Sequence, residues 1–178
     1  MALVKPFIFQ IVGYQNSGKT TFTTKLIETL TARELKIVTI KHHGHGGKPD
    51  SLLQKDSVKH LASGATASIV EGEGRLILQA DNGHYSLEHQ MELLEFFNPD
   101  VILIEGYKQG AYPKLLLLRE GKDVSLLDKV SHLAVVGYWN EEIKDLVTAK
   151  LTVPIFPISD ERLLSWISEY IQEQIHSN

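Results

Sequence analysis

Residues Gly13–Thr20 match every fixed position of the phosphate-binding pattern G-x-x-x-x-G-K-[ST]. An apolar run, Phe7–Val12, comes before this segment, and a run with helical periodicity comes after it. Strand, glycine loop and helix in this order are the context in which the pattern binds phosphate. We therefore expect a buried parallel strand that ends in a phosphate loop, followed by a helix.

The residues of this loop suit a nucleotide polyphosphate. Glycines let backbone N–H groups converge on an anion, and the start of the helix adds the positive end of its dipole. Lys19 can reach the β- and γ-phosphates as a catalytic cation, and the Thr20 hydroxyl can bind Mg²⁺. The residues expected to bind the nucleotide here are Gly13, Asn16, Ser17, Gly18, Lys19, Thr20 and Thr21.

Apolar strands alternate with helical stretches along the chain. Residues Phe22, Leu26 and Leu30 recur at helical spacing and indicate one buried stripe. Later strands are expected at Ile37–Ile40, Val101–Ile104, Lys114–Leu118, Ala134–Val136 and Ile155-Phe156. The alternation predicts an α/β fold of the P-loop NTPase type, with a mostly parallel sheet covered by helices on both faces. We expect one domain over residues 1–178.

Composition narrows the kinds of protein this chain can be. It contains no cysteine, which excludes disulfides, thiolate metal sites and cysteine nucleophiles and suits a cytoplasmic protein. The formal net charge of −4 argues against a broad basic face for nucleic acid. No apolar run approaches the ~18 residues that a membrane span needs. We expect a cytoplasmic protein whose partners include neither nucleic acid nor membrane.

Two acidic residues are candidates for binding Mg²⁺. Glu105 follows the apolar strand Val101–Ile104, and ligands of such sheets bind beyond the carboxyl ends of the strands. Its carboxylate could hold the metal or, as a catalytic residue, orient the attacking water. Asp56 is the second candidate, or else it lies on a solvated helix face with Lys59. Lys108, close after Glu105, can reach an anionic ligand.

A histidine-rich segment follows the strand Ile37–Ile40, at the sheet edge where the phosphate loop is expected. Lys41, His42, His43 and His45 lie there among glycines. Charge and exposed amides could bind an anion or a pterin-type ligand. Imidazoles also suit Zn, Ni and Cu, and a flexible solvated loop is the third interpretation.

The dipeptide Asn82-Gly83 predicts a β-hairpin. It lies between the extended runs Leu76–Leu78 and His84-Tyr85, and Asn-Gly is favoured in tight hairpin turns. A hairpin interrupts the regular alternation of strand and helix. It can pair on the sheet edge or reach a second subunit, so we expect an inserted hairpin and a homodimer.

The chain resembles the MobB family of molybdopterin-guanine dinucleotide biosynthesis proteins over essentially its whole length. The segments that carry this resemblance, in order, are Gly13–Thr21, Lys41–His45, Asp56-Ser57 with Gly64-Ala65, and Ile104–Lys108. The resemblance implies a cytosolic, dimeric P-loop protein that binds GTP with Mg²⁺, hydrolyses GTP weakly and assists the guanylyltransferase MobA, which joins GMP to molybdopterin. It also implies that Glu105 is the strand-end acid, and that His43 and His45 line the place where a second anionic ligand meets the nucleotide. Molybdopterin or the molybdenum cofactor is then a further partner.

The guanine-binding pattern Asn-Lys-x-Asp of many GTPases is absent. After the strand Ala134–Val136 the chain has Gly137–Asn140, and the later Pro157–Asp160 could contact the base instead. The expected preference for guanine therefore follows from the resemblance. No arginine is recognisable as a catalytic finger, so we expect slow hydrolysis.

Other functions fit the same patterns. The chain could be a metal-delivery GTPase that uses the histidine-rich segment, or a small-molecule kinase. It could also be a nucleotide-binding module that signals to a partner through its conformation.

Overall fold

The computed structural model describes residues 5–44, 56–81 and 83–177. Contacts divide the chain into two compact units, one formed by Met1–Gly44 with Met91–Asn178 and the other by His45–Gln90. Each unit has a sheet of its own. No helix within the described ranges is long and apolar enough to cross a bilayer.

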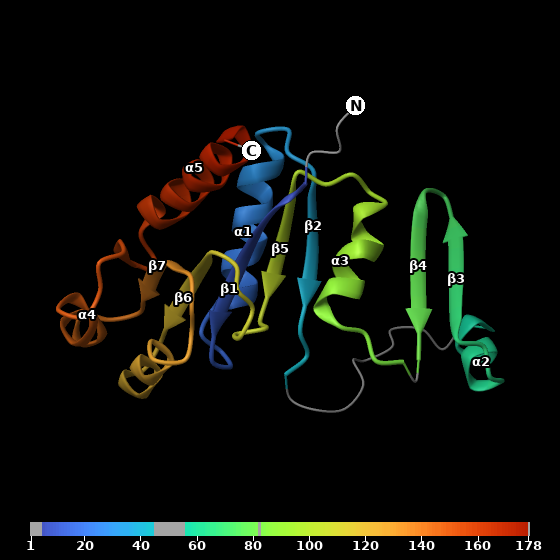
Figure 1. Ribbon diagram of the computed structural model, residues 1–178, viewed down its shortest axis with the longest axis horizontal. Helices are drawn as coiled ribbons and strands as arrows, with labels where there is room; N and C mark the ends of the chain where they lie inside the picture. Colours follow the sequence, from blue (N-terminus) through green and yellow to red (C-terminus); the bar gives the residue numbers. More distant parts are fainter. Residues whose placement is uncertain (1–4, 45–55, 82, 178) are drawn as a thin grey trace. The chain divides into compact units, whose positions relative to one another are not determined.

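The first unit contains a six-stranded sheet in the order β2-β5-β1-β6-β7-β8, with every neighbouring pair parallel (Figure 1). Its strands are β1 (Phe7–Gly13), β2 (Ile37–Lys41), β5 (Val101–Glu105), β6 (Lys114–Leu118), β7 (Leu133–Tyr138) and β8 (Ile155–Pro157). The predicted parallel α/β sheet is confirmed. Because β1 lies between β5 and β6, the carboxyl end of β1 has a strand end on either side.

Helices cover both faces of this sheet. Those of the first unit are α1 (Lys19–Thr31), the 3₁₀ turn η1 (Gly121–Leu126), α4 (Glu141–Thr148) and α5 (Glu161–Ser177), while α3 (Leu87–Glu95) spans the boundary between the units. Buried side chains of α1 and α5 pack on one face, and those of η1 and α4 pack on the other. The sequence analysis did not predict α4 or η1.

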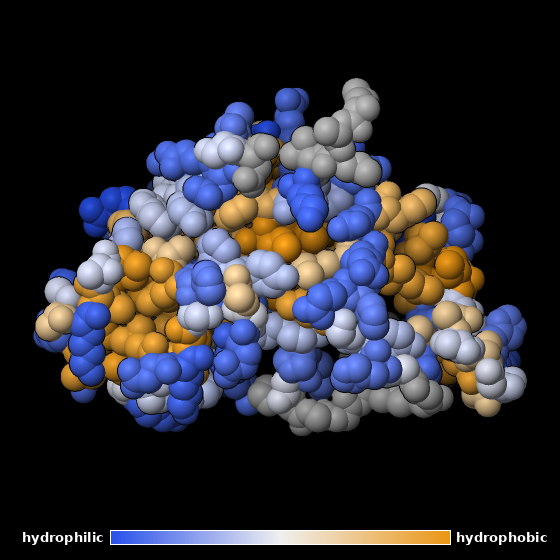
Figure 2. Space-filling view, viewed as in Figure 1, coloured by the Kyte–Doolittle hydropathy of each residue, from blue (hydrophilic) through white to orange (hydrophobic). Residues whose placement is uncertain are grey.

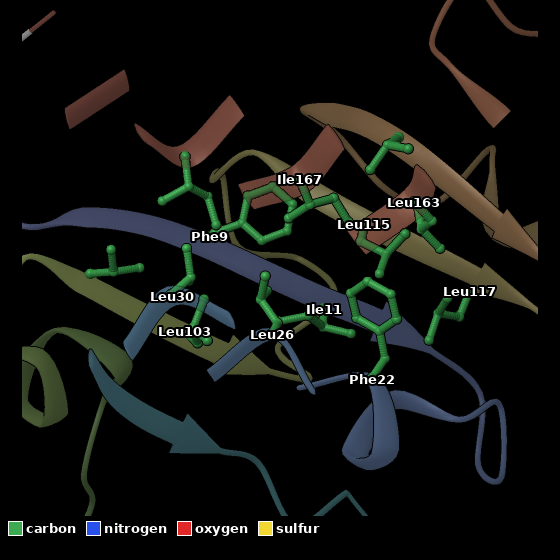
Figure 3. Packing of buried hydrophobic residues seen from close by; sticks show 13 residues of the cluster. Phe9, Ile11, Phe22, Leu26, Leu30, Leu103, Leu115, Leu117, Leu163 and Ile167 are labelled. Carbon is green, nitrogen blue, oxygen red and sulfur yellow. The ribbon is translucent and has the colours of Figure 1, made fainter. Parts of the chain in front are cut away.

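The larger core lies between the sheet and the pair α1 and α5 (Figure 3). Phe22, Leu26 and Leu30 form the buried stripe of α1, as predicted from their spacing. Leu163 and Ile167 extend from α5 into the same cluster. Helix α1 is thereby fixed against the strands, and its first residue is held at the end of β1.

The second unit contains the helix α2 (Asp56–Ala62) and an antiparallel hairpin, β3 (Ala67–Gly72) with β4 (Arg75–Ala80). The hairpin turn is at Glu73-Gly74, so its predicted place at Asn82-Gly83 is wrong. Both turn residues have positive φ, 49° and 79°, as a tight turn of this kind requires. The run Leu76–Leu78 pairs with the strand before it, and residues 83–86 form no strand. Asn82 lies outside the described residues.

Replacing a side chain of the α1 stripe should destabilise the first unit. Leu26 is 0% exposed, so Leu26→Ala leaves a cavity that its neighbours fill only in part. We expect the free energy of unfolding to fall by about 2–5 kcal/mol, measured by urea denaturation. The matched control is Leu146→Ala on α4, where the side chain is 46% exposed and the loss should be about 0.5 kcal/mol or less. Equal losses in the two variants would contradict this packing.

Candidate functional site

The loop between β1 and α1 has the backbone shape of a phosphate loop. Asn16 and Gly18 have positive φ, 59° and 93°. A Cβ atom on Gly13 would lie 2.5 Å from Ser17 Oγ and 2.8 Å from the carbonyl oxygen of Leu117, so only glycine fits there. The loop is thus folded tightly against β6, and α1 begins directly after it at Lys19.

The ammonium group of Lys19 lies within this loop. Its Nζ donates a hydrogen bond to the carbonyl oxygen of Tyr14 at 2.6 Å. Burial lowers the pKa of Lys19; Glu105 opposes that shift, while the positive charges of Lys108 and Lys41 add to it. An anion in the loop would reverse this penalty because it stabilises the charged form.

Thr20, Glu105 and Lys41 form a hydrogen-bonded cluster next to the loop. Thr20 Oγ1 donates to Glu105 Oε1 at 2.9 Å and accepts from Lys41 Nζ at 2.9 Å. The Lys41 ammonium is also 3.1 Å from Glu105 Oε1. Lys41 and Glu105 are register partners at the ends of β2 and β5, which explains why they meet. A positive charge therefore lies beside both the hydroxyl and the carboxylate that were expected to bind Mg²⁺.

The segment after β5 passes close to the end of β2. The His42 backbone N–H donates to the carbonyl oxygen of Glu105 at 2.9 Å, and the rings of His42 and Tyr107 are 4.5 Å apart. At Gly106 a Cβ atom would lie 3.0 Å from the Cβ of His42, so the glycine permits this approach. Lys108 Nζ lies 5.6 Å from the centre of the Tyr14 ring, which brings its positive charge to the phosphate loop.

His43, His45 and Asp56 were also predicted for the site. His43 is exposed and follows β2, while His45 lies outside the described residues. Asp56 belongs to the second unit, where it pairs with Lys59 at 2.8 Å. Among the residues that the structure describes, no group of three or more histidine, aspartate or glutamate side chains could hold a metal ion.

The structure adds two residues that the sequence analysis did not assign to the site, Arg119 and Trp139. They line a pocket of about 420 Å³. The other lining residues are Asn16, Gly18, Lys19, Thr20 and Thr21, all of them from the predicted phosphate site. Arg119 directly follows β6 and Trp139 directly follows β7, so the strand-end rule that identified Glu105 would have identified both.

Comparisons with known proteins agree with this architecture. The family model of molybdopterin guanine dinucleotide synthesis protein B matches residues 8–138. A probable molybdopterin-guanine dinucleotide biosynthesis adapter protein of Bacillus subtilis is 40% identical over 162 residues, which cover 90% of this chain and 91% of that protein. The Escherichia coli adapter protein is 28% identical over 171 residues, covering 94% of each chain.

Solved structures lead to the same family. The crystal structure of Bacillus subtilis MobB superimposes with a TM-score of 0.79 at 36% identity, covering 90% of this chain and 94% of that one. A MobB homologue from Bacillus stearothermophilus gives a TM-score of 0.74 at 27% identity, covering 93% and 98%. The chain belongs to the family of molybdopterin guanine dinucleotide synthesis protein B, MobB.

Proposed function

We propose that this chain is a cytoplasmic GTP-binding accessory protein of molybdopterin-guanine dinucleotide biosynthesis, which assists a MobA-like guanylyltransferase. The observation that carries the proposal is the phosphate loop with Lys19 inside it and the Thr20–Glu105 pair beside it. Relatives named as adapter proteins of this biosynthesis support the pathway. The preference for guanine rests on the family.

The phosphates of the nucleotide bind in the loop between β1 and α1. Lys19 Nζ exchanges its hydrogen bond with the Tyr14 carbonyl for one to a phosphate oxygen, and the N–H groups at the start of α1 face the anion. Lys41 and Lys108 add positive charge around the same place. These groups stabilise the negative charge of a triphosphate through contacts that do not depend on the base.

Thr20 and Glu105 fit a Mg²⁺ ion. The Lys41 ammonium shows that a cation can be held here, because it lies within 3.1 Å of both Thr20 Oγ1 and Glu105 Oε1. A hydroxyl and a carboxylate are hard oxygen ligands of the kind that Mg²⁺ prefers. When bound, the metal would neutralise charge on the phosphates. Lys41 would then release Thr20 and Glu105, and its ammonium would be available to an anionic ligand.

We expect the isolated protein to hydrolyse GTP slowly. Arg119 is an arginine within the pocket, but its guanidinium donates to the carbonyl oxygen of Asn16 at 2.7 Å. A side chain held in this way is not directed at the transferred phosphate, and an arginine that is so directed contributes about 10³–10⁵ in rate. The protein accordingly acts through binding and its partner, with molybdopterin or the molybdenum cofactor as the second ligand.

A homodimer forms through the hairpin of the second unit. Ile69 and Leu78 are register partners on one face of β3 and β4, and they are 61% and 37% exposed. Leu76 lies on the same face and is 51% exposed. Figure 2 shows apolar side chains over these strands. A small hairpin with such a face is stabilised when a second copy covers it.

Removing the loop lysine should abolish nucleotide binding. For Lys19→Ala we expect the affinity for a GTP analogue with Mg²⁺ to fall at least about a hundredfold, because a charged hydrogen bond to phosphate is lost. Calorimetric titration with GTP and ATP analogues measures both the loss and the preference for guanine. Lys25→Ala, an exposed lysine of the same helix, is the control. Unchanged affinity in folded Lys19→Ala would refute the site, and a preference for ATP would favour the kinase alternative.

Removing Lys41 should make nucleotide binding more responsive to Mg²⁺. In Lys41→Met no ammonium competes for Thr20 and Glu105, so the ratio of GTP affinities with and without Mg²⁺ should rise about two- to fivefold, as for an ion pair whose lysine is exposed to solvent. Calorimetry at fixed GTP and varied Mg²⁺ gives this ratio. Glu105→Gln is the control with the opposite expectation: it removes the proposed metal-binding carboxylate and should lower this ratio. An unchanged ratio in Lys41→Met would show that this lysine does not share its ligands with the metal.

Placing charge on the apolar hairpin face should separate the dimer. Ile69→Lys with Leu78→Lys is expected to sediment with the chain mass of 20.0 kDa, whereas the unchanged protein should sediment at twice that mass. Val70→Lys is the matched control, since Val70 is 40% exposed on the opposite face of the hairpin. A monomeric unchanged protein at micromolar concentration would refute the dimer, and a dimeric double variant would refute this interface.

A further inference from the structure

Arg119 and Trp139 lie side by side at the pocket because of strand register. Leu118 of β6 and Tyr138 of β7 are partners in the parallel pair, so the residues that directly follow them emerge together at the same edge. Both side chains line the pocket with the phosphate loop. The binding of phosphate and metal described above does not use either side chain as a ligand.

Two hydrogen bonds to the phosphate loop orient this pair. Arg119 Nη1 donates to the carbonyl oxygen of Asn16 at 2.7 Å, and Trp139 Nε1 donates to that of Ser17 at 3.0 Å. The Arg119 guanidinium carbon lies 5.4 Å from the centre of the Trp139 ring, within the range of a cation–π contact. Two planar groups are thus held together, each fixed to a neighbouring residue of the loop.

The surface of this pair is open to a ligand. Trp139 is 47% exposed, although large aromatic side chains are usually well buried, and Arg119 is exposed. The indole also lies against the loop, since a Cβ atom on Gly18 would be 3.2 Å from its Cζ2. A molecule whose phosphates lie in the loop would therefore have its next groups beside a flat, positively charged surface.

Two polar side chains that follow β7 and β8 are already engaged in hydrogen bonds of their own. Asn140, the residue after Trp139, accepts the backbone N–H of Ile143 at 3.1 Å and caps α4. Asp160, which follows β8, accepts hydrogen bonds from the guanidinium of Arg162, the shortest at 2.6 Å. A base that stacks on Arg119 and Trp139 leaves the hydrogen bonds of the engaged residues in place.

We infer that the purine base of the bound nucleotide stacks on the surface formed by the Arg119 guanidinium and the Trp139 indole. The inference rests on the proposed nucleotide binding and adds where and how the base is held. A purine offers a π face to the guanidinium plane and to the ring, and such stacking tolerates different bases. This mode of binding does not require the Asn-Lys-x-Asp pattern, which the chain lacks after β7.

The test compares a nucleotide with its phosphates alone. Dissociation constants for GTP and for inorganic tripolyphosphate, each with Mg²⁺, are measured by calorimetry on the full chain. Arg119→Lys keeps a cation that can donate to Asn16 but removes the planar group. We expect it to weaken GTP roughly tenfold, in line with the loss of one stacking partner, and tripolyphosphate less than about twofold. Arg33→Lys, at the far end of α1, is the control and should change neither.

The two dissociation constants separate the possible failures. If Arg119→Lys weakens tripolyphosphate as much as GTP, Arg119 serves the phosphates or the loop, and the inference is overturned. If GTP binds and neither constant changes in the variant, the inference is also overturned while the nucleotide site stands. If the unchanged protein binds neither ligand, the proposed function fails and the inference fails with it.

Indole emission gives a second readout that a purely structural role would not produce. In a Trp166→Phe background, Trp139 is the remaining tryptophan, because the sequence contains two. We expect GTP to quench its emission by stacking and tripolyphosphate to leave it nearly unchanged. Equal responses to both ligands would show that the indole senses the loop rather than a base, and would overturn the inference.

Discussion

In a parallel sheet every strand brings its last residue to the same edge, and the hydrogen-bond register decides which of those residues meet. Here Lys41 and Glu105 end two paired strands, while Gly13 pairs with Leu117 on the other side of β1. The register of β6 and β7 places Arg119 next to Trp139. Each group of the site is therefore positioned by the backbone before any ligand binds, and the apolar core beneath the sheet maintains that register.

Charge is distributed unevenly around the loop. Lys41 and Lys108 both lower the pKa of Lys19, and the carboxylate of Glu105 opposes them, while burial is the largest influence. Holding several ammonium groups close together without an anion costs free energy. In the proposed function, binding a polyphosphate removes that cost, which favours a ligand with several negative charges over one with a single charge.

Local patterns were sufficient to predict the phosphate loop, α1 and the positions of the strands in the parallel sheet. The spacing of the glycines and Lys19 is a property of one segment, and so is the helical stripe of α1 that follows it. Glu105 could be placed because a strand-end residue needs only its own strand to be recognised. Helix α4 was missed because it is short, although Asn140 at its N-cap and the acidic residues of its first turn are signals of a helix start.

What could not be predicted depends on contacts between distant segments. Arg119 and Trp139 each follow a predicted strand, but the sequence does not state that β6 and β7 follow β1 in the sheet, so it did not show that the two residues lie beside the loop. The hairpin was misplaced for a similar reason. Asn82-Gly83 is the stronger local turn signal, but pairing of Ala67–Gly72 with Arg75–Ala80 selects the turn at Glu73-Gly74.

The contacts of Gly18 have a consequence for the order in which the chain is made. A Cβ atom there would lie 3.0 Å from Ile158 Cδ1 and 3.2 Å from Trp139, so the loop is packed against residues that leave the ribosome long after it. A nascent chain that ends before residue 139 carries the whole phosphate-binding signature without the side chains that hold its backbone. The phosphate loop therefore completes its packing contacts only after most of the chain has been synthesised.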